Sequence, residues 1–128
     1  MKSGVVSPEP SLSELPILDP HPLQELLEIG AGVELVQELI GILREDVPLR
    51  MALMQSGLEA RDTEKVMMEA HQLKGSSGNL GLLRLAELAR QIEAEARAGR
   101  LEQVPAWLKA IPGALEEGLA ALGEAFPS

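Results

Sequence analysis

The stretch "EAHQLKGSSGNLG", residues 69–81, decides how the rest of the chain is interpreted. It lies within a run of helix-forming residues, yet it contains glycine at positions 75, 78 and 81. Glycine in a helix interior costs roughly 0.5–1 kcal/mol relative to alanine. Because these glycines follow one of the only two histidines in the chain, they indicate that open space beside this histidine has a function.

The composition around this stretch favours an all-α protein. The chain has 128 residues, of which 45% are hydrophobic and 24% charged, which suits one domain with a buried core. Only 2% of the residues are aromatic, and the abundant Leu, Ala and Glu favour helices over strands. We predict an antiparallel up-down-up-down four-helix bundle with an additional short N-terminal helix, because short connections force neighbouring helices to run in opposite directions.

Prolines and glycines divide the chain into segments. We expect residues 1–20, which are rich in Pro and Ser, to be a flexible segment and residues 21–128 to form the bundle domain. The apolar pattern predicts helices over residues 22–29, 33–59, 63–79 and 82–98, and from about residue 101 onward. Pro48 and Pro112 fall inside the second and the last of these helices.

The charge and the missing residue types exclude several classes of function. A net charge of −9 without a basic stripe argues against a nucleic-acid partner. The absence of cysteine excludes zinc–thiolate sites and cysteine nucleophiles, and two histidines are too few for a di-metal bundle. Without a long apolar run or a signal peptide, we expect a cytoplasmic protein with no membrane segment. The scarcity of aromatic residues offers no obvious interface and favours a monomer, but the sequence leaves the oligomeric state open.

A helix turns about 100° per residue, which assigns a core face and a solvent face to the helix predicted over residues 63–79. His71 lies about 140° from the centre of the core face and Gly75 about 180°, so both should face solvent, with Lys74 on the shoulder beside His71. The predicted core face consists of Val66, Ala70, Leu73, Ser77 and Leu80. The predicted partner contacts are Glu64, Met67, Met68 and Gly78.

This combination suits phosphoryl transfer. A neutral imidazole nitrogen of His71 is a nucleophile towards phosphorus. Lys74 would stabilise the charge on the moving phosphoryl oxygens, and Gly75 would leave them room. A lone histidine facing solvent is most often an ordinary surface residue, and we interpret His21 in that way. The spacing of Lys74 and Gly75 after His71 favours a functional interpretation for His71.

The segment "AHQLKGSSGNLG", residues 70–81, resembles the H-x-L-K-G-S-S-x-x-L-G signature of histidine phosphotransfer (HPt) domains of multistep His–Asp phosphorelays. The resemblance implies that His71 is the phosphoacceptor, that Lys74 assists with phosphate charge and that Gly75 gives clearance. It also implies that the partners are response-regulator receiver domains and a hybrid histidine kinase. The receiver would supply Mg²⁺ and the aspartate, so this phosphocarrier would need no cofactor of its own and would have no kinase or ATPase activity.

In some HPt relatives, a polar side chain on the following helix contacts the ring nitrogen that does not react. Glu93 is our candidate by spacing, because it neighbours Ile92 of the core stripe. Its carboxylate would fix the tautomer and raise the basicity of the attacking nitrogen. Gln91 is the alternative candidate, and Glu93 as an ordinary solvated glutamate is a third interpretation.

Other functions remain open at this point. A docking or adaptor bundle would bind receiver domains without carrying phosphate. A histidine kinase is excluded for this chain because it contains neither a glycine-rich nucleotide loop nor a strand pattern. The sequence is compatible with a free-standing protein and with a domain of a larger kinase, and it does not identify the phosphodonor, the final acceptor or the signal.

Overall fold

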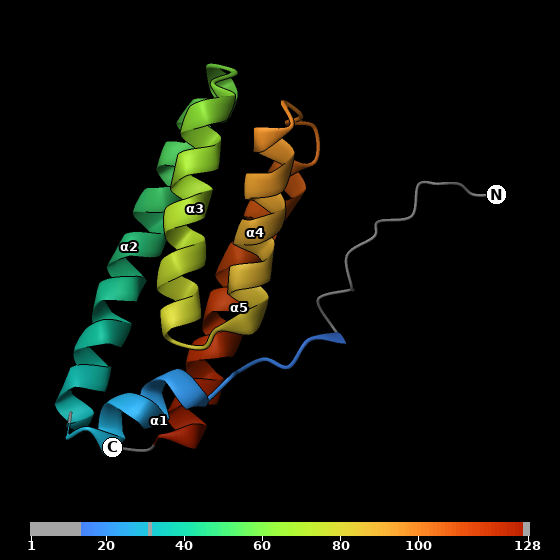
Figure 1. Ribbon diagram of the computed structural model, residues 1–128. Helices are drawn as coiled ribbons and strands as arrows, with labels where there is room; N and C mark the ends of the chain where they lie inside the picture. The colour runs from blue at the N-terminus through green and yellow to red at the C-terminus, as the bar shows by residue number, and fades with distance from the viewer. Residues whose placement is uncertain (1–13, 31, 127–128) are drawn as a thin grey trace.

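Five α-helices follow one another in this computed structural model, which describes residues 14–30 and 32–126. They are α1 (His21–Glu28), α2 (Val33–Glu59), α3 (Thr63–Asn79), α4 (Leu83–Arg97) and α5 (Val104–Ala125). Figure 1 shows α2 to α5 running alternately up and down beside one another, with α1 across their lower end. The described residues form no strand beyond one isolated bridge. The predicted up-down-up-down bundle with a short N-terminal helix is therefore confirmed.

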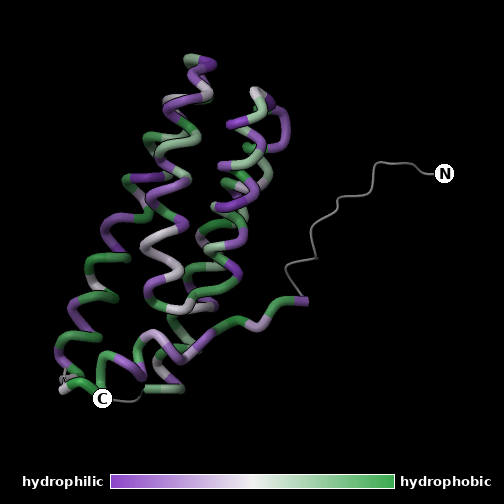
Figure 2. Tube along the Cα trace, in the orientation of Figure 1, coloured by the Kyte–Doolittle hydropathy of each residue, from purple (hydrophilic) through white to green (hydrophobic). Residues whose placement is uncertain are grey.

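Each long helix contributes an apolar stripe to one shared core. The core face predicted for α3 is buried, and α4 and α5 each bury an apolar stripe against it. Fully burying one Leu or Ile side chain contributes about 1.5–3 kcal/mol. Figure 2 shows that α5 is largely hydrophobic, whereas hydrophilic residues recur along the visible side of α3 and α4. Within residues 14–30 and 32–126, no helix has the length and apolar character needed to cross a membrane.

Local signals set the ends of the two helices that carry the site. The Asp62 side chain caps α3 by accepting a hydrogen bond from the Lys65 backbone N–H at 3.1 Å, so α3 begins at Thr63, as the sequence predicted. Gly99, with φ of +81°, follows the end of α4, as expected for a residue that tolerates the left-handed conformation. The short connection from Asn79 to Leu83 then places α3 and α4 side by side in opposite directions.

The chain just before α1 lies against the turn between α3 and α4. Leu18 pairs with Leu82 in the isolated antiparallel bridge, and the Asp19 N–H donates to the Gly81 carbonyl at 2.8 Å. The last residues of the segment predicted to be flexible, residues 1–20, thus make backbone contacts with the bundle, and the boundary of that segment stays a prediction. Its residues 1–13 lie outside the described part of the chain.

Gly81, the third glycine of the opening stretch, has a structural role. Its φ of +76° lies in the left-handed region, and a Cβ built on it would collide with the Asp19 carbonyl oxygen. Gly75 and Gly78 differ from it, since a Cβ on either would meet no atom within 4 Å. Of these three glycines, only Gly81 is therefore required by the fold itself.

We predict that Gly81→Ala lowers the free energy of unfolding by about 1–3 kcal/mol, because a left-handed conformation strains alanine and the added methyl group displaces Asp19. Urea unfolding followed by circular dichroism measures this. Gly113→Ala is the matched control: Gly113 lies within α5 and has open space around it, so alanine there should be neutral or stabilising. Equal stabilities for Gly81→Ala and the wild type would contradict the prediction.

Candidate functional site

His71 lies in the middle of α3 and faces solvent, as the helical periodicity predicts. Its side chain is 60% exposed, whereas its helix neighbours Ala70 and Leu73 are fully buried. Those two residues hold the opposite side of α3 against the core and so direct the imidazole outward. The surface beside the ring is open, because Gly75, one turn further along, is exposed and carries no side chain.

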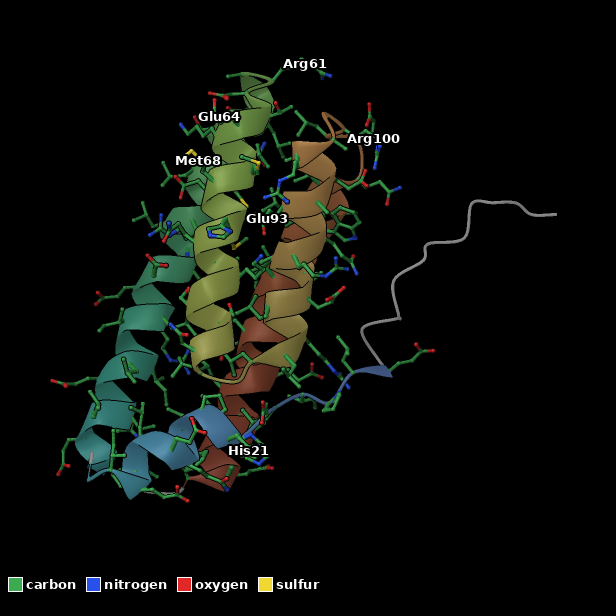
Figure 3. The ribbon with its side chains drawn as sticks, viewed as in Figure 1. His21, Arg61, Glu64, Met68, Glu93 and Arg100 are labelled. Atoms are coloured by element: carbon green, nitrogen blue, oxygen red, sulfur yellow. The ribbon has the colours of Figure 1, made fainter. Side chains whose placement is uncertain are left out.

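The ring is held from the neighbouring helix by Glu93 of α4. The Nδ1 atom of His71 lies 2.9 Å from Oε2 of Glu93, and Glu93 is only 3% exposed. Figure 3 shows Glu93 between α3 and α4. The predicted contact is present, and the interpretation of Glu93 as a solvated glutamate is wrong. Gln91, the alternative candidate, instead donates to Glu87 at 3.0 Å.

Two cations share the same carboxylate. The ammonium of Lys74 lies 2.8 Å from Oε1 of Glu93, and Nη2 of Arg97 donates to Oε2 at 2.8 Å. Lys74 is therefore engaged by Glu93 and does not simply project into solvent beside His71. Arg97 was not predicted as a site residue. Its position four residues after Glu93 on α4 is the favourable order for a helical acid–base pair, which is a weak signal that the sequence does contain.

The three donors decide the charge of the buried carboxylate. Burial raises the pKa of Glu93, but hydrogen bonds from Lys74, His71 and Arg97 outweigh it and lower the pKa from 4.5 to about 2. An ionised Glu93 requires a proton on Nδ1 of His71 as the hydrogen-bond donor. The lone pair of the neutral ring then lies on Nε2, which has no hydrogen-bond partner among the described residues.

A shallow cleft of about 250 Å³ opens beside the ring. It is lined by Met67, Met68, His71, Gln72, Glu93 and Arg97. Two of the four predicted partner contacts, Met67 and Met68, thus adjoin His71. Glu64 does not line this cleft and lies near the upper end of α3 (Figure 3).

Gly78, the remaining predicted contact, lines a different hollow of about 500 Å³ between α1, α2 and the end of α3. In the described residues, no three His, Cys, Asp or Glu side chains are grouped so as to hold a metal ion.

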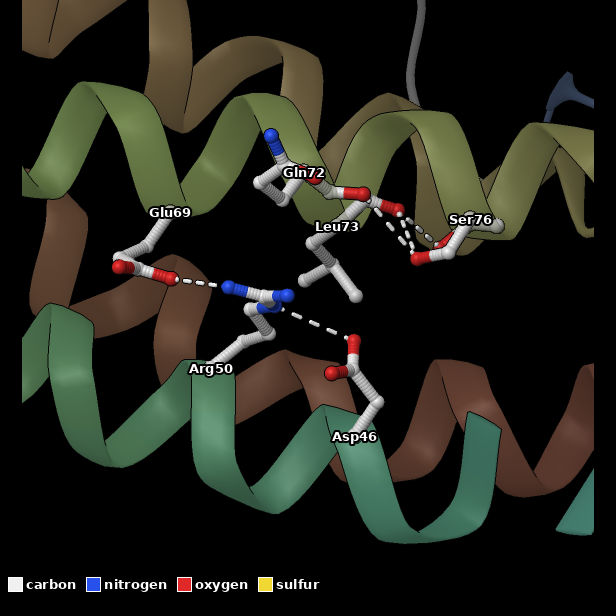
Figure 4. Close-up of polar contacts among 7 residues, drawn as sticks. Asp46, Arg50, Glu69, Gln72, Leu73 and Ser76 are labelled. Carbon is white, nitrogen blue, oxygen red and sulfur yellow. Dashed lines mark hydrogen bonds and ion pairs between the residues drawn. The ribbon is translucent and has the colours of Figure 1, made fainter. Parts of the chain in front are cut away.

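On its other side, α3 is fastened to α2 by a half-buried arginine (Figure 4). Arg50 donates to Glu69 of α3 at 2.7 Å and to Asp46 of its own helix at 3.2 Å. The two serines of the opening stretch bond to their own helix: Ser76 donates to the Gln72 carbonyl at 3.1 Å, and Ser77 donates within α3 in the same way. The arginine contacts link α3 to α2 on the side of α3 that faces away from His71.

We predict that Glu93 makes the protein acid-sensitive. Because its folded-state pKa is lowered, it stabilises the fold above its unfolded value of 4.5, and this stabilisation is lost as the pH falls towards 2. The free energy of unfolding of the wild type should fall by on the order of 1–3 kcal/mol from this group over that range. Urea unfolding at a series of pH values measures it.

Glu93→Gln should remove this part of the pH dependence. Glu102→Gln, at an exposed glutamate after α4, is the control and should keep it. Carbon NMR of the side-chain carboxyl groups gives the pKa directly, and an ordinary value for Glu93 would show that the three donors do not hold it ionised.

Comparison with known proteins gives this geometry a family context. Residues 38–125 match the family model of the Hpt domain. Aerobic respiration control sensor protein ArcB of Escherichia coli (strain K12) is 30% identical over 106 residues, which cover 83% of this chain and 12% of that protein. The ArcB of Shigella flexneri matches to the same extent. The chain thus spans only a small part of these relatives.

Solved structures agree with this assignment. The crystal structure of histidine-containing phosphotransfer protein B (HptB) from Pseudomonas aeruginosa PAO1 superposes with a TM-score of 0.74 at 25% identity, covering 86% of this chain and 94% of that one. The histidine-containing phosphotransfer domain of ArcB from Escherichia coli gives a TM-score of 0.67 at 23% identity, covering 84% and 95%, which shows a shared fold. The chain therefore belongs to the Hpt domain family and has a histidine phosphotransfer role in phosphorelays.

Proposed function

We propose that His71 is the residue that accepts the phosphoryl group from a receiver-domain aspartate and passes it to the aspartate of another receiver. The observation that carries this proposal is the pairing of an exposed imidazole with a buried carboxylate: Nδ1 is engaged by Glu93 at 2.9 Å, so Nε2 is the nitrogen left to react. The partners would be receiver domains and a hybrid histidine kinase.

The chemistry at His71 needs no separate base. The lone pair on Nε2 attacks the phosphorus of an aspartyl phosphate and forms the N–P bond, while the P–O bond breaks and its electron pair returns to the aspartate carboxylate. The proton on Nδ1 stays in its hydrogen bond to Glu93, which offsets the positive charge that the ring gains. Transfer to the second receiver reverses these steps.

The remaining residues of the site would position and neutralise the phosphoryl group. Lys74 would contact its oxygens, and Gly75 would give them clearance. Met67 and Met68, which line the cleft, would give the partner a soft apolar contact, with Glu64 and Gly78 towards the edges of the docking surface. Mg²⁺ would come with the receiver domain, and the chain itself would act as a phosphocarrier without kinase or ATPase activity.

We predict that incubation with a phosphorylated receiver places an acid-labile, base-stable label on the wild type and none on His71→Gln. The control is His21→Gln, which should take the label fully because His21 lies on α1. Nitrogen NMR of the labelled protein should show phosphorus on Nε2. Label on His71→Gln would contradict the assignment of His71 as the phosphoacceptor. A phosphorylated receiver that binds the wild type tightly but transfers no label would indicate that the chain is an adaptor.

We predict that Gly75→Ala separates stability from function. Gly75 lies inside α3 with open space around it, so alanine should raise the free energy of unfolding by about 0.5–1 kcal/mol. The added methyl group beside the imidazole should slow phosphoryl transfer roughly 10-fold by displacing the incoming group. Gly113→Ala in α5 serves as the control without an effect on transfer. An unchanged transfer rate for Gly75→Ala would contradict the proposal that the open space at Gly75 is needed for transfer.

A further inference from the structure

We propose that Arg97 is a positioning residue: it keeps the Glu93 carboxylate paired and aimed at His71, so that Lys74 is able to leave that carboxylate and contact the phosphoryl group. This inference rests on the proposed function of His71. It assigns different tasks to two cations that the resting structure shows on one carboxylate.

The two cations occupy different oxygens of Glu93. Lys74 contacts Oε1, whereas Arg97 shares Oε2 with Nδ1 of His71. Departure of Lys74 therefore leaves the oxygen that holds the imidazole undisturbed. Departure of Arg97 would remove the cation from that oxygen and leave the imidazole as its only partner among the described residues.

The helices that carry these side chains favour the same assignment. Lys74 lies on α3, three residues after His71, so it is anchored to the helix that carries the phosphoryl group. Arg97 lies on α4, four residues after Glu93, so it is anchored to the helix that carries the carboxylate. A lysine ammonium on a flexible four-carbon chain redirects readily, whereas a planar guanidinium is better suited to stay on a carboxylate.

Charge makes a second cation necessary. A phosphoryl group brings a charge of about −1.5 to −2 close to Glu93, whose side chain is only 4% exposed. With Lys74 turned to the phosphoryl oxygens, the buried carboxylate would keep only the ring N–H of His71 as a partner close to this charge, and a buried charge is tolerated only when it is well paired. Arg97 is 62% exposed yet bonded to Oε2, so it supplies that counter-ion from the solvent side.

The first experiment measures the unphosphorylated protein and so does not depend on phosphoryl transfer. Carbon NMR of the Glu93 carboxyl and nitrogen NMR of the His71 ring are recorded for the wild type, Arg97→Gln and Arg97→Lys. Arg100→Gln is the matched control, because Arg100 is 61% exposed and bonded to Glu95 at 2.7 Å, away from His71. Of the three variants, we expect only Arg97→Gln to raise the pKa of Glu93 and to lose the fixed Nδ1–H tautomer of His71. Arg97→Lys should keep most of the lowered Glu93 pKa and most of the Nδ1–H tautomer.

The second experiment is a double-mutant cycle in the transfer reaction. Arg97→Gln should slow transfer about 10-fold, as the loss of an orienting partner typically does. Lys74→Gln should slow the wild type, but it should add little to Arg97→Gln, because Lys74 then stays on Glu93. Independent effects that multiply would overturn the proposal and indicate that both cations contact the phosphoryl group.

Two further outcomes would also overturn it. One is an Arg97→Gln protein that transfers at the wild-type rate. The other is an Arg97→Gln protein that is less stable in urea but has an unchanged Glu93 titration, which would indicate a structural role alone. If the wild type takes no label at all, the proposed function fails, and the NMR experiment still decides whether Arg97 holds Glu93.

Discussion

The hydrogen bond between the exposed ring of His71 and the buried carboxylate of Glu93 is the interaction on which the site depends. It joins a side chain that has to meet another protein to one that is fixed in the interior. Its 2.9 Å length is set by the packing of α3 against α4. The bundle thus orients the imidazole through a side chain on a second helix, whereas a neighbour on α3 would move together with the ring.

A buried carboxylate is stable here because its partners are numerous. Burial disfavours the charge of Glu93, and the two cations and the ring N–H reverse that effect. The same partners form the site. Because the buried carboxylate requires cations, Lys74 and Arg97 both lie on Glu93, close to His71. In the proposed mechanism, folding and phosphoryl transfer use the same charges, so a change to one of these side chains would alter both. A change at Gly75 would act on transfer only by filling the space beside the ring.

The sequence predicted the features that local rules govern, and it missed those that depend on how helices meet. The segment boundaries and the period of the helix predicted the start of α3 and the outward direction of His71. The contact of Glu93 was predicted with the help of the family resemblance. The contacts of Lys74 and Arg97 with Glu93 were not predicted, because they depend on the rotamers of long side chains between two helices. The contact of Asp19 with Gly81 was missed because backbone atoms make it.

The residues of the opening stretch therefore do not all serve one purpose. Leu73, Ser77 and Leu80 are core, and Gly81 allows the chain before α1 to cross the turn, so these positions of the motif specify a bundle. The structure adds what the motif does not contain: α4 places a buried carboxylate opposite the ring and an arginine on that carboxylate, both at positions outside the motif.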